Sequence, residues 1–328
     1  MGANTHIQWT DHTFNGWEGC TKVSPGCAHC YAETRNKRFS DGVNWGKGAP
    51  RRRTSVSNWN LPRKWNRDAG GEGPETLECP SCGVRWHDCE CGFAQRRSRV
   101  FCSSLADWLD DEVPIEWLAD LLELIRTTPN LDWQLLTKRP ENWAKRLNAV
   151  FLMPGLDESR ENWILKWTVR KEAPANVWMG TTVENQEFAN LRIPLLLEIP
   201  ARVRFLSCEP LLGPVEIEEH LEDMVDGGYV LGSAPIHWVI CGGESGAGAR
   251  PMHPDWARSL RDQCASAGVP FFFKQWGEWA PGVVADIPTN TPTVLMKPDS
   301  RVMVRVGKES AGRLLDGKEH SAFPEATK

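Results

Sequence analysis

The sequence predicts an α/β protein built as a partial or complete (β/α) barrel. Short apolar runs alternate with amphipathic stretches between residues 100 and 276, a pattern typical of a parallel sheet covered by helices. About seven such runs can be counted when a weak first strand near residues 7–10 is included. That number suits a barrel, or part of one, better than a small doubly wound sheet.

The individual elements are expected in chain order from their apolar periodicity. Each predicted strand is a short apolar run that ends in polar residues, and the predicted helices repeat apolar residues every three or four positions. Pro114 suits the first turn of a helix, and Gly268 suits a helix end. Strands are expected at residues 7–10, 100–102, 133–137, 177–181, 203–207, 238–241, 270–274 and 301–306. Helices are expected at residues 114–128, 140–147 and 254–267, with a short one ending at residue 315.

Two regions interrupt this alternation, so four segments are expected. Residues 1–38 would hold the first strand and a loop with three cysteines. Residues 39–98 read as a long basic insertion rich in Trp and Arg, with a zinc knuckle of its own. Residues 99–285 would form the barrel body, and residues 286–328 a C-terminal extension of one strand and one helix.

The composition excludes several classes of protein. The net charge of −5 does not favour polyanion binding by the molecule as a whole. No apolar run approaches the roughly 18 residues that a membrane helix needs, and the N-terminus lacks a secretory pattern. Eleven cysteines in such a chain favour metal sites over disulfides. We therefore expect a cytoplasmic protein without a membrane partner.

Three cysteines near the start of the chain carry the clearest functional signal. Cys20, Cys27 and Cys30 form a C-x6-C-x2-C pattern, and Pro25 and Gly26 provide a turn that could bring Cys20 to the other two. Three thiolates leave one position open at a tetrahedral metal ion or on one iron of a [4Fe–4S] cluster. An open position indicates chemistry, whereas a closed four-ligand site usually indicates structure.

A second group of cysteines lies in the predicted insertion. Its spacing is C-x2-C-x6-C-x-C, and it begins with the C-P-x-C-G sequence of many zinc knuckles. A bound zinc ion would fold a segment too small for its own core. His87 could replace one of the cysteines, and reduced thiols or another metal remain the alternative. The proposed ligands are Cys79, Cys82, Cys89 and Cys91.

Polar residues follow nearly every predicted strand. Because the carboxyl ends of parallel strands gather at one edge of a sheet, these residues are candidates for holding a ligand. The alternative is that loops are polar in any protein. Lys138 and Arg139 are candidates for a phosphate or carboxylate. The candidates for a cofactor or substrate are Glu184, Asn185, Glu209 and the glycine-rich turn Gly242, Gly243, Glu244 and Ser245.

The predicted insertion is locally basic. Between Arg35 and Arg67 there are ten Lys and Arg residues against one acid, Asp41, a balance of +9. A phosphate backbone could bind the basic run, with Trp59 and Trp65 stacking on bases. The alternative is a solvated loop. The arginines proposed for phosphate contact are Arg51, Arg52 and Arg53.

Several of these motifs together resemble a known family. The matching segments are residues 19–33, 47–53, 136–140, 207–213, 241–246, 305–308 and 311–317. They resemble the phage protein family Gp-thirty-seven/Gp-sixty-eight, which has a three-Cys motif and no assigned function and looks like an outlier of the radical S-adenosylmethionine (SAM) superfamily. The first gap of six residues departs from the usual C-x3-C-x2-C of that superfamily.

The resemblance implies a radical SAM fold and chemistry. Cys20, Cys27 and Cys30 would bind three irons of a [4Fe–4S] cluster, SAM would chelate the fourth, and a 5′-deoxyadenosyl radical would result. The substrate is unknown; the basic insertion suggests a nucleotide or nucleic acid. Such an enzyme needs an electron donor, and a phage-encoded one would work in the host cytoplasm. The rival hypothesis is a non-catalytic, zinc-binding nucleic-acid-interaction protein of phage origin.

Overall fold

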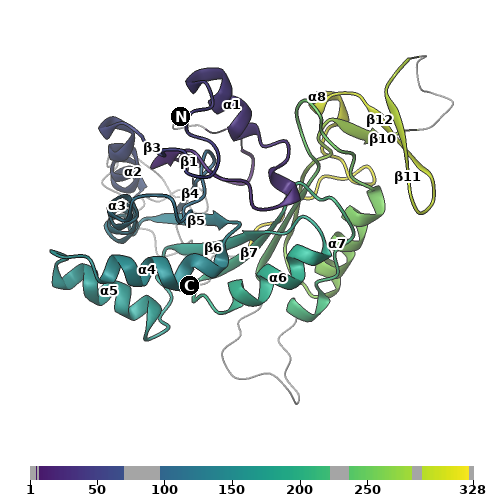
Figure 1. Cartoon of the computed structure of the whole chain (residues 1–328). Coiled ribbons are helices and arrows are strands. Elements are labelled where there is room, and N and C mark those ends of the chain that lie inside the picture. Colours follow the sequence, from purple (N-terminus) through teal and green to yellow (C-terminus); the bar gives the residue numbers. More distant parts are fainter. Residues whose placement is uncertain (1–4, 6, 70–96, 222–235, 283–289, 325–328) are drawn as a thin grey trace, which may run out of the picture.

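Seven parallel strands form one curled sheet, a half-barrel, in the computed structural model (Figure 1). The model describes residues 5, 7–69, 97–221, 236–282 and 290–324. The sheet runs in the order β1-β4-β5-β6-β7-β8-β9, so each strand pairs with the next one of the sheet along the chain. The strands are β1 (His12–Phe14), β4 (Ser98–Cys102), β5 (Leu131–Thr137), β6 (Val177–Thr182), β7 (Val203–Cys208), β8 (Trp238–Gly242) and β9 (Phe271–Gln275). The predicted α/β class and parallel half-barrel are confirmed.

The helices between these strands cover the outer face of the sheet (Figure 1). They are α3 (Ile115–Arg126), α4 (Trp143–Phe151), α5 (Glu158–Thr168), α6 (Gln186–Leu197) and α7 (Pro254–Ser266). Helix α3 shows why they fold there: Leu118, Leu121, Leu122 and Ile125 recur at helical spacing and are buried. The short 3₁₀ turns are η1 (Pro25–Cys27), η3 (Pro140–Asn142) and η4 (Glu218–His220).

The first predicted strand was misplaced. Residues 8 and 9 form a turn, and the strand begins at His12, where it pairs in parallel with Val100 of β4. Trp9 is apolar because it packs inside the half-barrel, where it is 2% exposed. The apolar character of residues 7–10 therefore reflects burial in a turn, not strand pairing.

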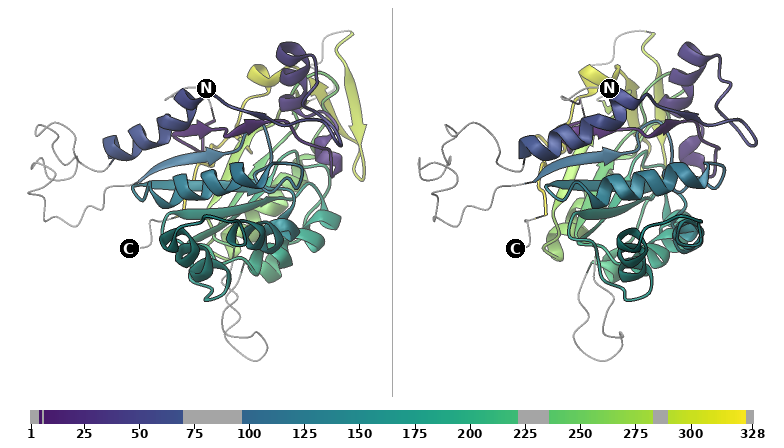
Figure 2. Two further views of the ribbon diagram at one scale, coloured as in Figure 1. Left: turned by 60° about the vertical axis from the view of Figure 1, so that its left-hand side comes forward. Right: turned by 90° about the vertical axis from the view of Figure 1, so that its left-hand side faces the viewer.

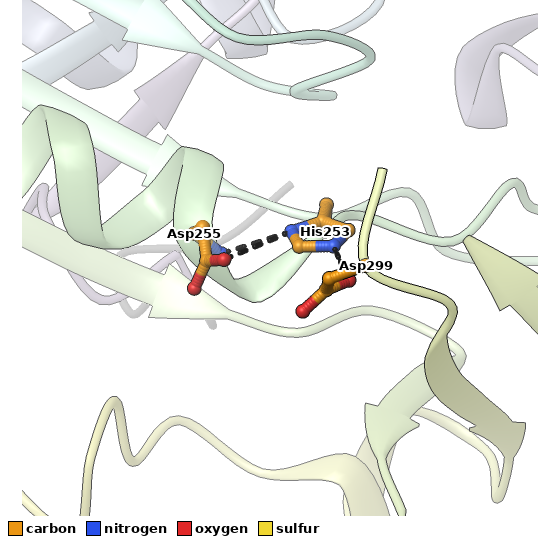
Figure 3. A group of neighbouring side chains, drawn as sticks. All are labelled: His253, Asp255 and Asp299. Atoms are coloured by element: carbon orange, nitrogen blue, oxygen red, sulfur yellow. Dashed lines mark hydrogen bonds and ion pairs between the residues drawn. The ribbon is translucent and has the colours of Figure 1, made fainter. Parts of the chain in front are cut away.

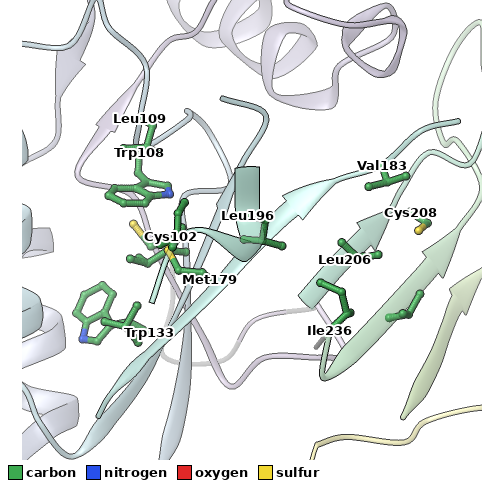
Figure 4. Close-up of a cluster of buried hydrophobic side chains, with 14 of the residues drawn as sticks. Cys102, Trp108, Leu109, Trp133, Met179, Val183, Leu196, Leu206, Cys208 and Ile236 are labelled. Carbon is green, nitrogen blue, oxygen red and sulfur yellow. The ribbon is translucent and has the colours of Figure 1, made fainter. Parts of the chain in front are cut away.

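Side chains alternate between two cores along each strand, as the pleat of a sheet requires. Outward-facing residues such as Trp133, Met179 and Leu206 pack with Leu196 of α6 (Figure 4). Inward-facing residues form an aromatic floor within the half-barrel. This aromatic floor consists of Trp9, Phe101, Trp178, Phe205, Trp238 and Phe272. The inner face is therefore filled at one end of the strands and free to hold a ligand at the other.

Residues 39–69 belong to the same body as the half-barrel. They contribute β3 (Arg52–Arg53), which pairs with β2 (Trp17–Glu18), and helix α2 (Val56–Ala69). Helix α2 lies along the first edge of the sheet (Figure 2), where Trp65 stacks on His12 with ring centroids 4.3 Å apart. Trp59 and Trp65 are 7% and 5% exposed, so the hypothesis that they stack on bases is wrong.

The C-terminal region adds a small sheet beside the half-barrel. Strands β10 (Trp279–Pro281), β12 (Arg301–Arg305) and β11 (Thr293–Met296) form it in that order, followed by helix α8 (Lys308–Ala311). The chain then covers the aromatic floor, where Trp238 Nε1 donates to the Ala322 carbonyl at 2.9 Å and the Phe323 ring lies 5.2 Å from that of Trp238. In the described part, every helix is too short or too polar to span a bilayer.

Candidate active site at the carboxyl ends of the strands

A cavity of about 940 Å³ opens at the carboxyl ends of the half-barrel strands. Cys20, Cys27 and Cys30 all line it. They face a wall built from the ends of successive strands and the loops that follow them. This wall includes Ser103, Lys138, Thr182, Ser207, Glu209, Gly243 and Lys274. The aromatic floor contributes Trp9 and Phe101 to the bottom of the cavity.

The cysteine loop, residues 19–30, connects β2 to helix α1 (Tyr31–Ser40). Its start is fixed at Gly19, whose amide donates to the Leu105 carbonyl at 3.2 Å. Gly19 has φ +112°, and a Cβ there would lie 2.3 Å from the Asn44 carbonyl oxygen, so only glycine fits. Pro25 then starts the 3₁₀ turn that contains Cys27, and Cys30 is the residue before α1.

Two buried arginines hold the first part of the cysteine loop. Arg139 donates to Cys20 Sγ at 3.5 Å, to the Thr21 carbonyl at 2.8 Å and to Asp107 at 3.1 Å. Arg51 donates to the Thr21 hydroxyl and also to Asp110, Glu112 and two backbone carbonyls. These five acceptors match the five N–H donors of a guanidinium, so Arg51 keeps no donor for a phosphate.

A buried carboxylate lies beneath the second part of the loop. Glu184 is fully buried, pairs with Arg192 at 2.8 Å and accepts a hydrogen bond from the Ser24 hydroxyl. A Cβ on Gly26 would lie 2.5 Å from Glu184 Oε1, so the loop backbone rests directly on this carboxylate. Glu184 therefore anchors the loop and is not among the residues that line the cavity.

The glycine-rich turn after β8 supports the loop from the other side. Glu244 accepts three hydrogen bonds from Arg250, one of them from its backbone amide. Arg250 in turn donates to the Pro25 carbonyl at 2.9 Å. A Cβ on Gly243 would lie 1.9 Å from the Trp276 carbonyl oxygen, so this turn packs against the end of β9 as only glycine allows.

Burial governs the ionisation of two of the three thiols. Removal from water raises the pKa of Cys20 to about 12, although the nearby Arg139 guanidinium opposes the shift. Burial also raises the pKa of Cys30, against a smaller opposing effect of Lys138. Both side chains are therefore neutral thiols near pH 7, and metal binding would release their protons.

The three thiol sulfurs are spread around the cavity. Tetrahedral zinc with bonds of about 2.3 Å needs its sulfur ligands roughly 3.8 Å apart. The described residues contain one group of three possible ligands within 4.8 Å of one another, namely His253, Asp255 and Asp299. Cys20, Cys27 and Cys30 do not form such a group.

The His253 group joins two elements of the fold (Figure 3). His253 Nδ1 accepts from the Asp255 amide at the start of α7, and Nε2 lies 2.9 Å from Asp299 Oδ1 beside β12. Both ring nitrogens are thus engaged within the chain. His253 is therefore a structural residue.

The remaining predicted site residues divide into two groups. Glu209 and Ser245 line the cavity; Lys274 lies 3.0 Å from Glu209 Oε1, and Gln275 donates to Ser245 at 2.8 Å. Gly242 makes room for Glu209, whose Oε1 would be 2.7 Å from a Cβ there. Asn185 instead caps helix α6 by accepting from the Phe188 amide.

The predicted phosphate contacts also differ from one another. Lys138 lines the cavity and donates to the Thr182 hydroxyl at 3.0 Å, with no carboxylate partner in the described part of the chain. Arg52 pairs with Glu18, and Arg53 pairs with Asp120 at 2.6 Å. Cys79, Cys82, Cys89 and Cys91 lie outside the described residues.

Several residues of the cavity were not predicted from the sequence. Asp107 orients Arg139, Arg250 ties the glycine-rich turn to the cysteine loop, and Tyr31 and Arg35 form part of the wall. Of these residues, only Arg250 had a signal in the sequence, because it stands at the end of the glycine-rich run. Trp45 also lines the cavity, and its buried indole nitrogen has no partner in the described structure.

The comparison with protein families places this chain. Residues 4–324 match the model of DUF5131, described as a protein of unknown function. The chain belongs to the DUF5131 family. No curated protein and no solved structure matches it. The function proposed for this DUF5131 member therefore rests on the chemistry and geometry of the cavity.

Proposed function

We propose that this protein is an iron–sulfur enzyme of the radical SAM type, in which Cys20, Cys27 and Cys30 bind a [4Fe–4S] cluster. The observation that carries the proposal is that three thiols line a single cavity at the strand ends without all lying within 4.8 Å of one another. A cluster takes its three thiolates on three separate irons, so it does not need them around one ion. Among the described residues no fourth cysteine lines the cavity, so one iron would keep an open position.

The space and the polar groups around the thiols suit a second small molecule. About 940 Å³ lies at the upper end of the roughly 300–1,000 Å³ of small-molecule sites. Glu209, Glu244 and Ser245 line this space, and carboxylate and hydroxyl oxygens accept hydrogen bonds from an amino group or ribose hydroxyls. SAM carries both kinds of donor.

A cluster held by Cys20, Cys27 and Cys30 and reduced by an electron donor would supply one electron to SAM, whose sulfonium would split into methionine and a 5′-deoxyadenosyl radical that would take a hydrogen atom from a substrate. The chain's own residues prepare the site for that chemistry. Arg139 places a positive charge beside Cys20 and so favours its thiolate. Arg250, Glu244 and Glu184 hold the cysteine loop in place, while the aromatic floor keeps water from the lower end of the strands.

The first experiment measures iron and product together. The protein is reconstituted anaerobically with iron and sulfide, reduced, and incubated with SAM. We expect the broad visible absorption of an iron–sulfur cluster and the formation of 5′-deoxyadenosine. Cys27→Ser should lose most of both. Cys264→Ala, which removes a buried thiol away from the cavity, is the matched control and should retain both.

Two outcomes would contradict the proposal. A colourless protein that carries zinc at the three cysteines would favour the non-catalytic, zinc-binding alternative. A fully loaded and reduced protein that releases no 5′-deoxyadenosine, with and without nucleic acid, would count against radical chemistry. Equal iron loss in Cys27→Ser and Cys264→Ala would show that the cavity cysteines are not the ligands.

A further inference from the structure

Helix α1 presents two exposed aromatic rings and two arginines on one face. Tyr31 is 59% and Phe39 64% exposed, unusually high for large apolar rings. Arg35 and Arg38 lie between them at helical spacing, so all four side chains share one side of the helix. The side of α1 next to this face is buried through Ala32 and Asn36.

Both arginines lie close to the outer aromatic ring, that of Phe39. The guanidinium carbons of Arg35 and Arg38 each lie 5.3 Å from the centroid of the Phe39 ring. Arg35 also pairs with Glu18 at 3.1 Å, whereas Arg38 has no carboxylate partner in the described part of the chain. The face therefore offers an aromatic surface and one arginine, Arg38, that no described carboxylate neutralises.

This face leads directly into the cavity. Tyr31 and Arg35 belong to the cavity wall, and the Tyr31 hydroxyl donates to the Ser104 carbonyl, which holds the ring at the mouth. Lys308 of α8 lines the cavity as well. Lys138 lines the cavity beside the end of β5. The cavity wall thus carries the positive groups of Arg35, Lys138 and Lys308 beside the carboxylates of Asp107, Glu209 and Glu244.

We propose that the exposed face of α1 binds a single-stranded nucleic acid, one nucleotide of which enters the cavity as the substrate. Aromatic rings stack on unpaired bases of any sequence, and arginine and lysine neutralise the phosphates between them. Tyr31 and Phe39 supply the stacking, and Arg35 and Arg38 supply the charge. Lys138 lies where it can meet a phosphate of the nucleotide inside. This inference rests on the proposed function, because it names the substrate class of the same site.

A protein partner fits these features less well. An acidic electron-transfer protein would use the charge of α1, but it would have no use for positive groups in a cavity wall. Duplex nucleic acid has its bases stacked inside, so it could not use the exposed rings. The combination of exposed rings, arginines on α1 and a cavity-wall lysine, Lys138, without a described carboxylate partner favours an unpaired strand.

The test measures binding by the full-length protein without added iron. Fluorescence anisotropy follows a fluorescein-labelled oligothymidylate of about 16 nucleotides, the upper range of a single-strand site, at several salt concentrations. Arg38→Glu and Phe39→Ala should each weaken binding roughly tenfold, as expected for one lost phosphate or stacking contact. Lys64→Glu makes the same change of charge on α2, away from the cavity, and should stay within about twofold.

The outcomes separate the possibilities. A preference for the single strand over its duplex, lost in Phe39→Ala, supports the inference. Equal weakening by Lys64→Glu would overturn it, since the binding would then follow net charge alone. Undiminished oligonucleotide binding by Arg38→Glu, together with slower reduction by an acidic flavoprotein, would also overturn it and assign the face to an electron donor. Formation of 5′-deoxyadenosine without oligonucleotide is measured separately, so the proposed function and this inference can fail independently.

Discussion

Arg51 and its neighbour Arg52, the first residue of β3, have opposite roles although they share one run of arginines. The side chain of Arg51 is fully buried and pairs with Asp110, whose side chain is 1% exposed. The side chain of Arg52 is 52% exposed and pairs with Glu18. Nothing in a run of three arginines tells which one is buried, because that depends on where the loop before α3 brings Asp110 and Glu112. Arg51 therefore connects the cysteine loop to the α3 side of the molecule.

Loss of the Arg51 guanidinium should strongly destabilise the fold. Arg51→Met leaves Asp110 buried without its partner, which typically lowers the free energy of unfolding by about 3–5 kcal/mol. Arg52→Met, at the next residue, removes a half-exposed arginine from Glu18, which keeps Arg35 as its partner, and should lower it by less than about 1 kcal/mol. Urea unfolding of the metal-free protein measures both values. Similar losses in the two variants would show that Arg51 is not a structural anchor.

At the level of elements, strands β6 and β7 pack closely because one residue of β6 is a glycine. The Phe205 ring of β7 lies over Gly180 of β6, and a Cβ on Gly180 would approach ring atoms to 2.3 Å. The aromatic floor can thus extend across β6 because that strand has no side chain there. Gly180 pairs with Phe205 in the register of the two strands.

A methyl group at Gly180 should disturb this packing. Gly180→Ala forces the Phe205 ring aside, and overpacking of this kind typically lowers the free energy of unfolding by about 1–3 kcal/mol. Phe205→Leu combined with Gly180→Ala should recover part of that loss, because the smaller side chain leaves room. A double-mutant cycle in urea gives the coupling. Additive effects of the two substitutions would contradict the proposed contact.

The strands could be predicted from the sequence better than the site. Each central strand is a short apolar run between polar ends, so its position was predicted to within one or two residues. Helix α2 was missed because its buried residues, Trp59 and Trp65, stand among exposed basic ones. The cysteines, Glu209 and Lys138 were found because they follow strands or share a motif. Asp107 and Arg250 were missed because long loops bring them to the site without any periodic signal.

At the scale of the whole molecule, four buried thiols are distributed over the half-barrel. They come from strands β4, β7 and β8 and from helix α7, and burial raises the pKa of each. The shift brings Cys102 and Cys264 to about 12 and places Cys208 and Cys241 well above their ordinary value. All four thiols are buried and free of disulfides.

These thiols should make the protein sensitive to alkali. An unfolded thiol ionises near pH 9, whereas the folded one stays protonated, so stability is present below pH 9 and is lost as the pH rises toward 12. For Cys264 the shift from 9.0 to about 12 corresponds to about 4 kcal/mol, half of it lost by about pH 10.5. In Cys264→Ala the free energy of unfolding should fall less steeply as the pH rises. Urea unfolding at pH 8 and pH 10.5 measures the difference, and an unchanged pH dependence would contradict the assignment.

The hydrogen bond from Arg250 to the Pro25 carbonyl joins positions 225 residues apart. During synthesis the cysteine loop leaves the ribosome early, but the support it receives from the glycine-rich turn is made only after most of the chain has followed. The cysteines of the nascent loop therefore cannot take their final positions until the last strands of the half-barrel have formed. If the cysteine loop binds the proposed cluster, iron delivered before that moment would meet flexible ligands, and the cluster would form only after translation.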